Sequence, residues 1–184
     1  MAYLDQLTEF LKENKIPFKQ LDRYCQAFTH SSYVNEHRHL KIEDNERLEY
    51  LGDAVLELTV SNYLFNLKPA LSEGEMTKIR AQLVCEPSLE SYARNLNLGK
   101  LMLLGRGEEN SGGRERPTVL ADAFEAFLGA LFLDQGMKAV DNILNDCLVP
   151  RLSHPEDVGT IHDYKSKLQE FVQADKKRTV TYKL

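Results

Sequence analysis

The sequence is notable first for what it lacks. It has no run approaching the roughly 20 apolar residues that a membrane-spanning helix needs, so we expect no membrane partner. Its cysteines, Cys25, Cys85 and Cys147, are far apart and form no metal-ligand spacing, which indicates reduced thiols in a cytoplasmic protein. The acidic, amphipathic start, MAYLDQLTEFLKEN, has the pattern of neither a signal nor a transit peptide.

Catalytic and cofactor patterns of several kinds are also missing. The Gly-rich segment 105–116 lacks the GK[ST] ending of a phosphate-binding P-loop, so we expect a loop there and no nucleotide cofactor. No Ser/His/Asp or Cys/His arrangement is evident, and the five histidines form no recognisable site. His37 and His39 fall in the polar stretch after Tyr33, which is expected to be a loop up to Asp44.

Charge is distributed unevenly along the chain. The net charge of −5 by itself argues mildly against a nucleic-acid-binding protein. Residues 162–184, however, contain six Lys or Arg and three Asp or Glu, a net +3, which leaves −8 for the remainder. A basic end on an acidic body suggests that anion binding and cation binding are separated along the chain.

Apolar residues recur at helical spacing through the first 152 residues. No strand-like alternation is found before residue 178, so we expect an all-α body over 1–152, followed by a linker over 153–160. The predicted helices span 3–14, 20–28, 45–66, 72–84, 87–97, 117–134 and 137–152.

The stretch from Asn45 to Leu56, NERLEYLGDAVL, carries acids at spacings of three and four. On a helix, Glu46, Glu49 and Asp53 fall on one narrow face. The opposite side is apolar and carries Leu48, Leu51, Val55 and Leu58. Neighbouring like charges repel by a few tenths of a kcal/mol per pair on an exposed helix. The spacing alone is compatible with either a solvated acidic face or a cation site.

A second acidic pair lies in the segment LADAFEA. Asp122 and Glu125 are separated by one helical turn on an otherwise very apolar helix. Carboxylates on such a helix are rarely fully buried unless they are paired or bind a metal. The alternative is that this side of the helix is exposed.

Together these segments resemble the ribonuclease III family of metal-dependent endonucleases that cut double-stranded RNA. NERLEYLGDAVL is similar to the family signature, with Tyr50 where Phe is more usual, and LADxxEA and THSSY match two further segments. The resemblance implies a homodimer that binds Mg²⁺, or Mn²⁺ in its place. It implies four metal ligands, Glu49, Asp53, Asp122 and Glu125, and it places Asp53, Glu125, Glu46 and Glu73 among the catalytic acids.

The basic end resembles the start of a double-stranded RNA-binding domain. Residues 163–173 match its first helix and residues 179–182 its first strand, so 161–184 are expected to form an incomplete domain. The positions that match the RNA-contacting ones in the first helix are Ser166, Gln169, Glu170 and Gln173. Such domains recognise duplex RNA by shape, hydroxyl groups and phosphates.

The resemblance implies hydrolysis of phosphodiester bonds in double-stranded RNA, leaving 5′-phosphates and short 3′ overhangs. Ribosomal RNA precursors and structured messenger RNA are the substrates it implies. One alternative is an all-α nucleoside triphosphate pyrophosphohydrolase, which also arranges acids on facing helices. A second is a non-catalytic RNA-binding or ribosome-associated relative, which would be expected to have lost some of these acids.

Overall fold

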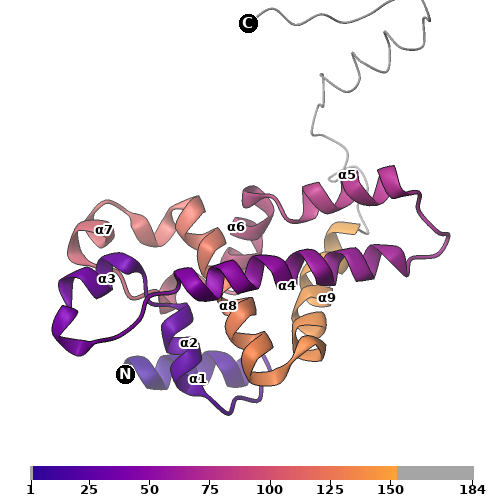
Figure 1. Cartoon of the computed structure of the whole chain (residues 1–184). Coiled ribbons are helices and arrows are strands. Elements are labelled where there is room, and N and C mark those ends of the chain that lie inside the picture. The colour runs from indigo at the N-terminus through magenta and orange to yellow at the C-terminus, as the bar shows by residue number, and fades with distance from the viewer. Residues whose placement is uncertain (1, 153–184) are drawn as a thin grey trace, which may run out of the picture.

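The computed structural model describes residues 2–152, and this part of the chain is built from helices (Figure 1). Within it are nine α-helices and three 3₁₀ helices: α1 (Tyr3–Glu13), α2 (Leu21–Ala27), α3 (Ser31–Glu36), η1 (Arg38–Leu40), α4 (Glu46–Phe65), α5 (Glu73–Leu83), α6 (Glu86–Asn95), η2 (Leu98–Leu101), α7 (Arg106–Asn110), η3 (Gly113–Glu115), α8 (Pro117–Gln135) and α9 (Met137–Leu152).

The all-α prediction is confirmed for these residues, where the one β-type pairing is an isolated bridge between Thr29 and Leu103. None of the helices within 2–152 is both long and apolar enough to cross a membrane. The predicted linker 153–160 and the RNA-binding segment 161–184 lie outside the described residues, as do Ser166, Gln169, Glu170 and Gln173. The domain boundaries therefore stay a prediction.

Helix α8 is the centre of the fold. Most of its residues are buried, including Phe124, Phe127 and Leu131. Helix α4 crosses it at the front in Figure 1, while α2, α6 and α9 pack on its other sides. Phe127 also meets the rings of Phe10 and Phe28, which ties α1 and the end of α2 to the same core.

The helix ends follow the sequence signals. Ser72 Oγ accepts a hydrogen bond from Glu75 N–H, and Glu75 Oε2 accepts one from Ser72 N–H at 2.8 Å, which completes a capping box at the start of α5. The side chain that caps α4 is Asp44, whose Oδ1 accepts from Glu46 N–H at 3.3 Å. Helix α8 ends at Gly136, where φ is +80°, a value that favours glycine.

Two segments expected to be loops contain short helices. The expected loop from Tyr33 to Asp44 includes the end of α3 and all of η1, and the Gly-rich segment 105–116 includes α7 and η3. The second segment is ordered by the Arg114 guanidinium. Its Nη1 donates to the carbonyls of Gly99 and Met102, at 2.5 and 2.9 Å, while Nε donates to Glu109. Local glycine content does not reveal this long-range anchoring.

The expected apolar side of α4 is only partly buried. Leu48 and Val55 are in the core, but Leu51 is half-buried and 57% of Leu58 is exposed, so the apolar side extends beyond what the core of one chain covers. The buried side is turned toward Gly52 and Leu56, which face α8. On its outer side α4 exposes three large apolar side chains: Tyr50 (84%), Leu58 (57%) and Phe65 (72%).

The crossing of α4 and α8 is close enough for the two backbones to touch. A Cβ on Gly52 would lie 1.8 Å from the carbonyl oxygen of Glu125, and a Cβ on Gly129 would lie 2.2 Å from that of Leu48. Neither separation is possible for real atoms, so a side chain at either position would push the helices apart. These two glycines therefore fix how closely α4 approaches α8.

The close contact between α4 and α8 predicts that a single methyl group added at Gly52 lowers the stability of the fold. Gly52→Ala should lower the free energy of unfolding by about 1–3 kcal/mol, because the added carbon meets backbone rather than a flexible side chain. Gly74→Ala is the matched control, because its Cβ would meet nothing within 4 Å. It should be neutral or stabilise by up to about 1 kcal/mol. Urea unfolding measures the stability of both variants. If Gly52→Ala is as stable as Gly74→Ala, the two helices can move apart at no measurable cost.

Candidate metal centre

Three of the predicted ligands meet where α4 crosses α8. Glu49 comes from α4, whereas Asp122 and Glu125 lie one turn apart on α8. Each offers a carboxylate oxygen, and these three oxygens lie within 4.8 Å of one another. All three side chains are half-buried. The α4–α8 crossing thus brings together acids that are more than 70 residues apart in the sequence.

Burial and mutual repulsion raise the pKa of each of these carboxyls. Loss of solvent is the largest cause for Glu125, whose pKa rises to about 8, followed by the charges of Asp53, Glu49 and Asp122. The pKa of Glu49 is raised by burial first and then by Asp122. Burial likewise raises the pKa of Asp122. The fold therefore holds negative charges together against a cost that a cation would relieve.

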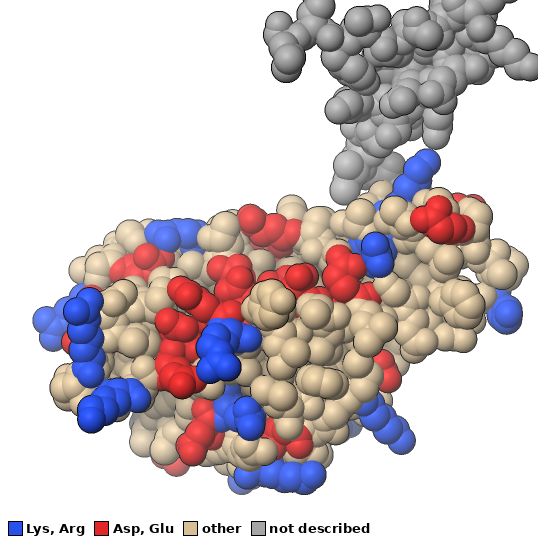
Figure 2. Space-filling model, viewed as in Figure 1, with Lys and Arg blue, Asp and Glu red and all other residues tan. Residues whose placement is uncertain are grey.

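Asp53, the fourth predicted ligand, lies at the margin of this cluster. Its side chain is exposed, and its oxygens are outside the three-residue group. It is still near enough that its charge is the largest single charge effect on the pKa of Glu125, and it also acts on Glu49. Glu46, likewise exposed, raises the pKa of Glu49. Figure 2 shows acidic side chains gathered on the face along which α4 runs.

Glu73 is not brought to this cluster within one chain. It lies in the first turn of α5, where its Oε1 accepts a hydrogen bond from Thr77 Oγ1 at 3.0 Å. It lines a hollow between α4 and α5 together with Phe65, which is the last residue of α4. The cluster lies toward the other end of that helix.

Glu57 has a structural partner. Its Oε2 lies 3.0 Å from Nε of Arg80, and the Nη1 of that arginine donates to Ser61 Oγ at 2.9 Å. The pair joins α5 to α4. This accounts for Glu57, which has the helical phase of Asp53 but no ligand position in the family pattern.

Sequence reasoning missed two neighbours of Asp122. His30 lowers the pKa of that carboxyl against the rise caused by burial, and Glu86 adds to the rise. His30 belongs to the THSSY segment, which resembles the family pattern, so a signal for it was present. Glu86 opens α6 and has no distinguishing pattern around it.

The ligand set suits a hard cation. Carboxylate oxygens are the donors that Mg²⁺ and Mn²⁺ prefer, whereas zinc sites in proteins favour nitrogen and sulfur. Two facing helices supply these oxygens on rigid backbone, and their raised pKa values show that the negative charges lack compensation from the protein. The residues present therefore fit a divalent cation.

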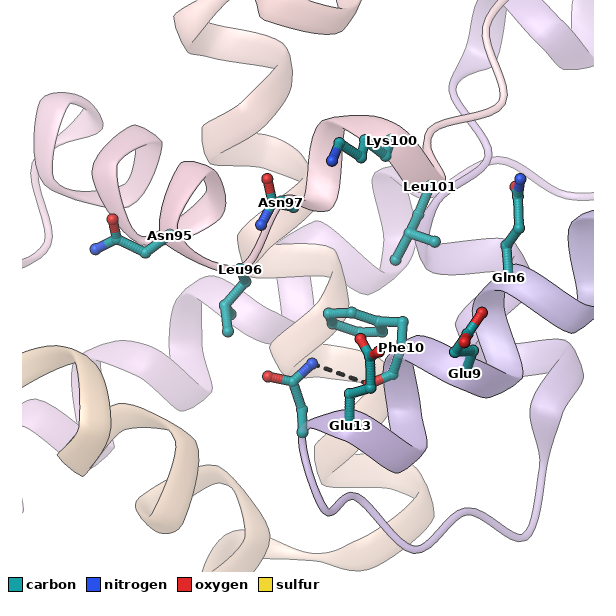
Figure 3. Close-up of a pocket in the computed structure, with 10 residues that line it drawn as sticks. Gln6, Glu9, Phe10, Glu13, Asn95, Leu96, Asn97, Lys100 and Leu101 are labelled. Carbon is teal, nitrogen blue, oxygen red and sulfur yellow. Dashed lines mark hydrogen bonds between the residues drawn. The ribbon is translucent and has the colours of Figure 1, made fainter.

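A sizeable hollow lies away from this cluster. About 550 Å³ in volume, it lies between α1 and the segment 95–101 (Figure 3). Phe10, Leu96 and Leu101 contribute apolar surface to it, and polar side chains such as Glu9 and Lys100 surround them. Its lining contains none of the clustered acids, so this hollow is separate from the candidate metal centre.

The family model and the similar proteins of known identity all belong to one family. The family model described as Ribonuclease-III-like matches residues 22–152. The chain is 54% identical over 181 residues to Ribonuclease 3 of Bacillus velezensis, covering 98% of this chain and 72% of that protein. It is 56% identical over 176 residues to Ribonuclease 3 of Anoxybacillus flavithermus, covering 96% and 74%.

Solved structures agree. The nuclease domain of ribonuclease III from Campylobacter jejuni matches with a TM-score of 0.68 and 39% identity, over 75% of this chain and 92% of that one. Dicer from Pichia stipitis matches more distantly, with a TM-score of 0.55 and 26% identity, over 90% and 73%. The sequence, the fold and the paired acidic helices lead to one conclusion: the chain belongs to the ribonuclease III family of endoribonucleases.

Proposed function

We propose that the chain hydrolyses phosphodiester bonds of double-stranded RNA at the α4–α8 carboxylate cluster, with Mg²⁺ as cofactor and Mn²⁺ as a substitute. One observation carries the metal assignment: the ligand oxygens of Glu49, Asp122 and Glu125 lie within 4.8 Å of one another. The substrate class follows from membership of the ribonuclease III family. That membership also favours this function over a nucleotide pyrophosphohydrolase or a non-catalytic relative.

The protein residues have separate tasks in this proposal. Glu49, Asp122 and Glu125 hold the cation, and Asp53 at the margin completes the set when substrate and cation are present. A bound divalent cation lowers the pKa of water and stabilises the charge that develops on the phosphate and the leaving oxygen. Glu46 and Glu73 are two further catalytic acids in this proposal, which support the site without being its central ligands.

Glu125 also controls a proton. With a pKa of about 8, its carboxyl is mostly protonated at neutral pH in the free protein. A cation must displace that proton, because a metal ligand has to be deprotonated. Metal affinity should therefore rise with pH through this range. Once deprotonated, Glu125 would be able to hold the cation together with Glu49 and Asp122.

We propose further that the protein acts as a cytoplasmic homodimer on ribosomal RNA precursors and structured messenger RNA. Each subunit would cut one strand and leave 5′-phosphate ends with short 3′ overhangs. Two observations support a dimer. Tyr50, Leu58 and Phe65 are exposed along α4, and the published description of the Campylobacter jejuni nuclease domain refers to a region involved in dimer formation.

The central prediction separates binding from chemistry. Glu125→Gln keeps the size of the side chain but removes one ligand charge, so cleavage of duplex RNA should fall by about two orders of magnitude or more, since the lost stabilisation is greatest in the transition state. RNA binding should persist, because phosphate then meets less negative charge. A gel-shift and a cleavage assay on one duplex in Mg²⁺ measure the two effects.

Single-stranded RNA is the control substrate, and Glu57→Gln is the control variant because Glu57 pairs with Arg80 outside the cluster. Cleavage at a near-normal rate by Glu125→Gln would remove Glu125 from the site.

A second prediction concerns pH. Because the folded-state pKa of Glu125 is raised to about 8, from about 4.3 in an unfolded chain, the folded state binds more protons than the unfolded state between these values. Stability of the metal-free protein should therefore be greatest below the lower value and fall as pH rises through about 8.

The raised pKa values of Glu49 and Asp122 act in the same direction. Melting temperatures recorded with a chelator between pH 5 and 9 should show this fall, and Glu125→Gln should flatten it. Adding Mn²⁺ should restore stability most at the high-pH end. A slope that is identical in the variant would show that other groups cause it.

A third prediction addresses assembly. Leu58→Asp places a charge among the exposed apolar side chains of α4 and should shift a dimer toward monomer in sedimentation velocity at micromolar concentration. Leu4→Asp on α1, where 51% of the side chain is exposed, is the matched control and should leave assembly unchanged. If the unaltered chain is a monomer that still cuts both strands, the dimer proposal fails.

A further inference from the structure

The segment that leads into α4 carries cations beside the carboxylate cluster. Arg38 lies in η1, Lys41 follows η1 directly, and Arg47 is in the first turn of α4. All three side chains are exposed. Helix α4 contains four acids in its 20 residues, whereas Arg47, two positions from Glu49, is its one Lys or Arg. Figure 2 shows Lys and Arg side chains next to the acids on the face along which α4 runs, and at the end of the molecule where α3 lies.

The turn that carries Arg38 and Lys41 is held in place by its own contacts. The His37 ring stacks on Tyr33, with 4.0 Å between the ring centroids, and its Nδ1 donates to the Tyr33 carbonyl at 2.9 Å. Leu40 N–H donates to the His37 carbonyl at 2.8 Å. A binding surface that is ordered in advance loses less conformational entropy when a ligand arrives.

The two acids between Lys41 and α4 have hydrogen-bond partners within the chain. Glu43 Oε2 accepts from Gln26 Nε2 at 3.1 Å, which ties the segment to α2. Asp44 Oδ1 accepts from Glu46 N–H at 3.3 Å and so caps α4. These carboxylates therefore have structural tasks at the entry to the helix.

The cations, in contrast, are only weakly engaged by the chain. Arg47 Nη1 lies 4.0 Å from Glu43 Oε2, and 86% and 67% of these two side chains are exposed. Exposed ion pairs of this kind contribute little to stability. Arg38 Nη2 lies 3.4 Å from Asn35 Oδ1, which is longer than a typical hydrogen bond. The neighbouring charges that shift the pKa of Glu49 are all acidic, so Arg47 does not compensate the cluster and its charge is available to an anion.

We propose that Arg38, Lys41 and Arg47 form a phosphate-binding surface that holds one strand of duplex RNA beside the metal centre. This inference rests on the proposed function and deepens it by naming residues that bind the substrate backbone. Arg47, two residues from Glu49, contacts a phosphate near the one that is cut, and Arg38 and Lys41 contact phosphates farther along the strand. None of the three touches the reacting atoms.

The chemistry of the substrate requires such a surface. The acids of the metal centre repel a phosphate backbone, whereas Lys and Arg contacts to phosphate supply much of the affinity of proteins for nucleic-acid duplexes. The planar guanidinium of an arginine can donate to two phosphate oxygens at once. Contacts to the backbone also suit a duplex that is recognised by shape and phosphates rather than by base sequence.

The test removes these charges without removing side-chain length. Arg38→Gln, Lys41→Gln and Arg47→Gln are made singly and together, and Lys138→Gln is the matched control because Lys138 is an exposed lysine of α9. Binding to one labelled RNA duplex is measured by fluorescence anisotropy over a series of low salt concentrations with a chelator. Cleavage of the same duplex is measured in Mg²⁺.

Each single variant should reduce the slope of log affinity against log salt by about 1, and the triple variant should reduce it by about 3. Lys138→Gln should leave the slope unchanged. In cleavage, the triple variant should raise KM with kcat near normal, because the lost contacts bind the ground state and the transition state equally. Melting temperature and the affinity for Mn²⁺ should not change, since the three side chains are exposed and are not ligands.

An unchanged slope and KM in the triple variant, with cleavage lost in Glu125→Gln, would overturn this inference and leave the proposed function standing. An equal fall in slope in Lys138→Gln would also overturn it, because binding would then follow net charge alone. A rise in KM that accompanies a shift to monomer in sedimentation velocity would remove Arg47 from the surface and assign it to assembly, since it lies one turn before the exposed Tyr50. If the unaltered chain binds the duplex but does not cut it in Mg²⁺, the proposed function fails, whereas the salt slopes still decide whether the three cations bind phosphate.

Discussion

The structure depends on the backbone contact between α4 and α8. Gly52 and Gly129 remove the side chains that would hold the two helices apart, since a Cβ at either place would overlap a carbonyl oxygen of the opposite helix. Glu49 and Asp53 flank Gly52 on one helix, and Glu125 is one turn from Gly129 on the other. The separation of the carboxylates is therefore set by helix packing rather than by loop conformation. A site built in this way is rigid before any cation arrives.

The burial that stabilises the fold also destabilises the charged form of the acids at the site. Burial of α8 among α2, α4, α6 and α9 supplies the favourable free energy, and the same burial removes solvent from Asp122 and Glu125. The Glu125 carboxyl is favoured in its protonated form as a result, since its pKa rises to about 8. The metal-free fold therefore tolerates its four neighbouring acids because one of them is largely uncharged at neutral pH. Binding of a cation, as proposed for this site, would require that carboxyl to lose its proton.

The sequence was sufficient for the longer helices and for the acids that lie on one face of each helix. Helical phase places Glu49 near Asp53 and Asp122 near Glu125 without reference to the fold. It could not show which carboxylates approach across the crossing, because that depends on Gly52 and Gly129 touching backbone. The same limit applies to the apolar side of α4: helical phase groups Leu58 with Leu48 and Val55, but only the packing of α4 on α8 decides which of them are buried.

Two other features that the sequence did not indicate also depend on tertiary contacts. Arg114 anchors a Gly-rich segment by bonding to carbonyls of Gly99 and Met102, and Ser32 links the THSSY segment to Gly105. In each case a polar side chain satisfies backbone groups from a distant part of the chain, which local composition cannot indicate.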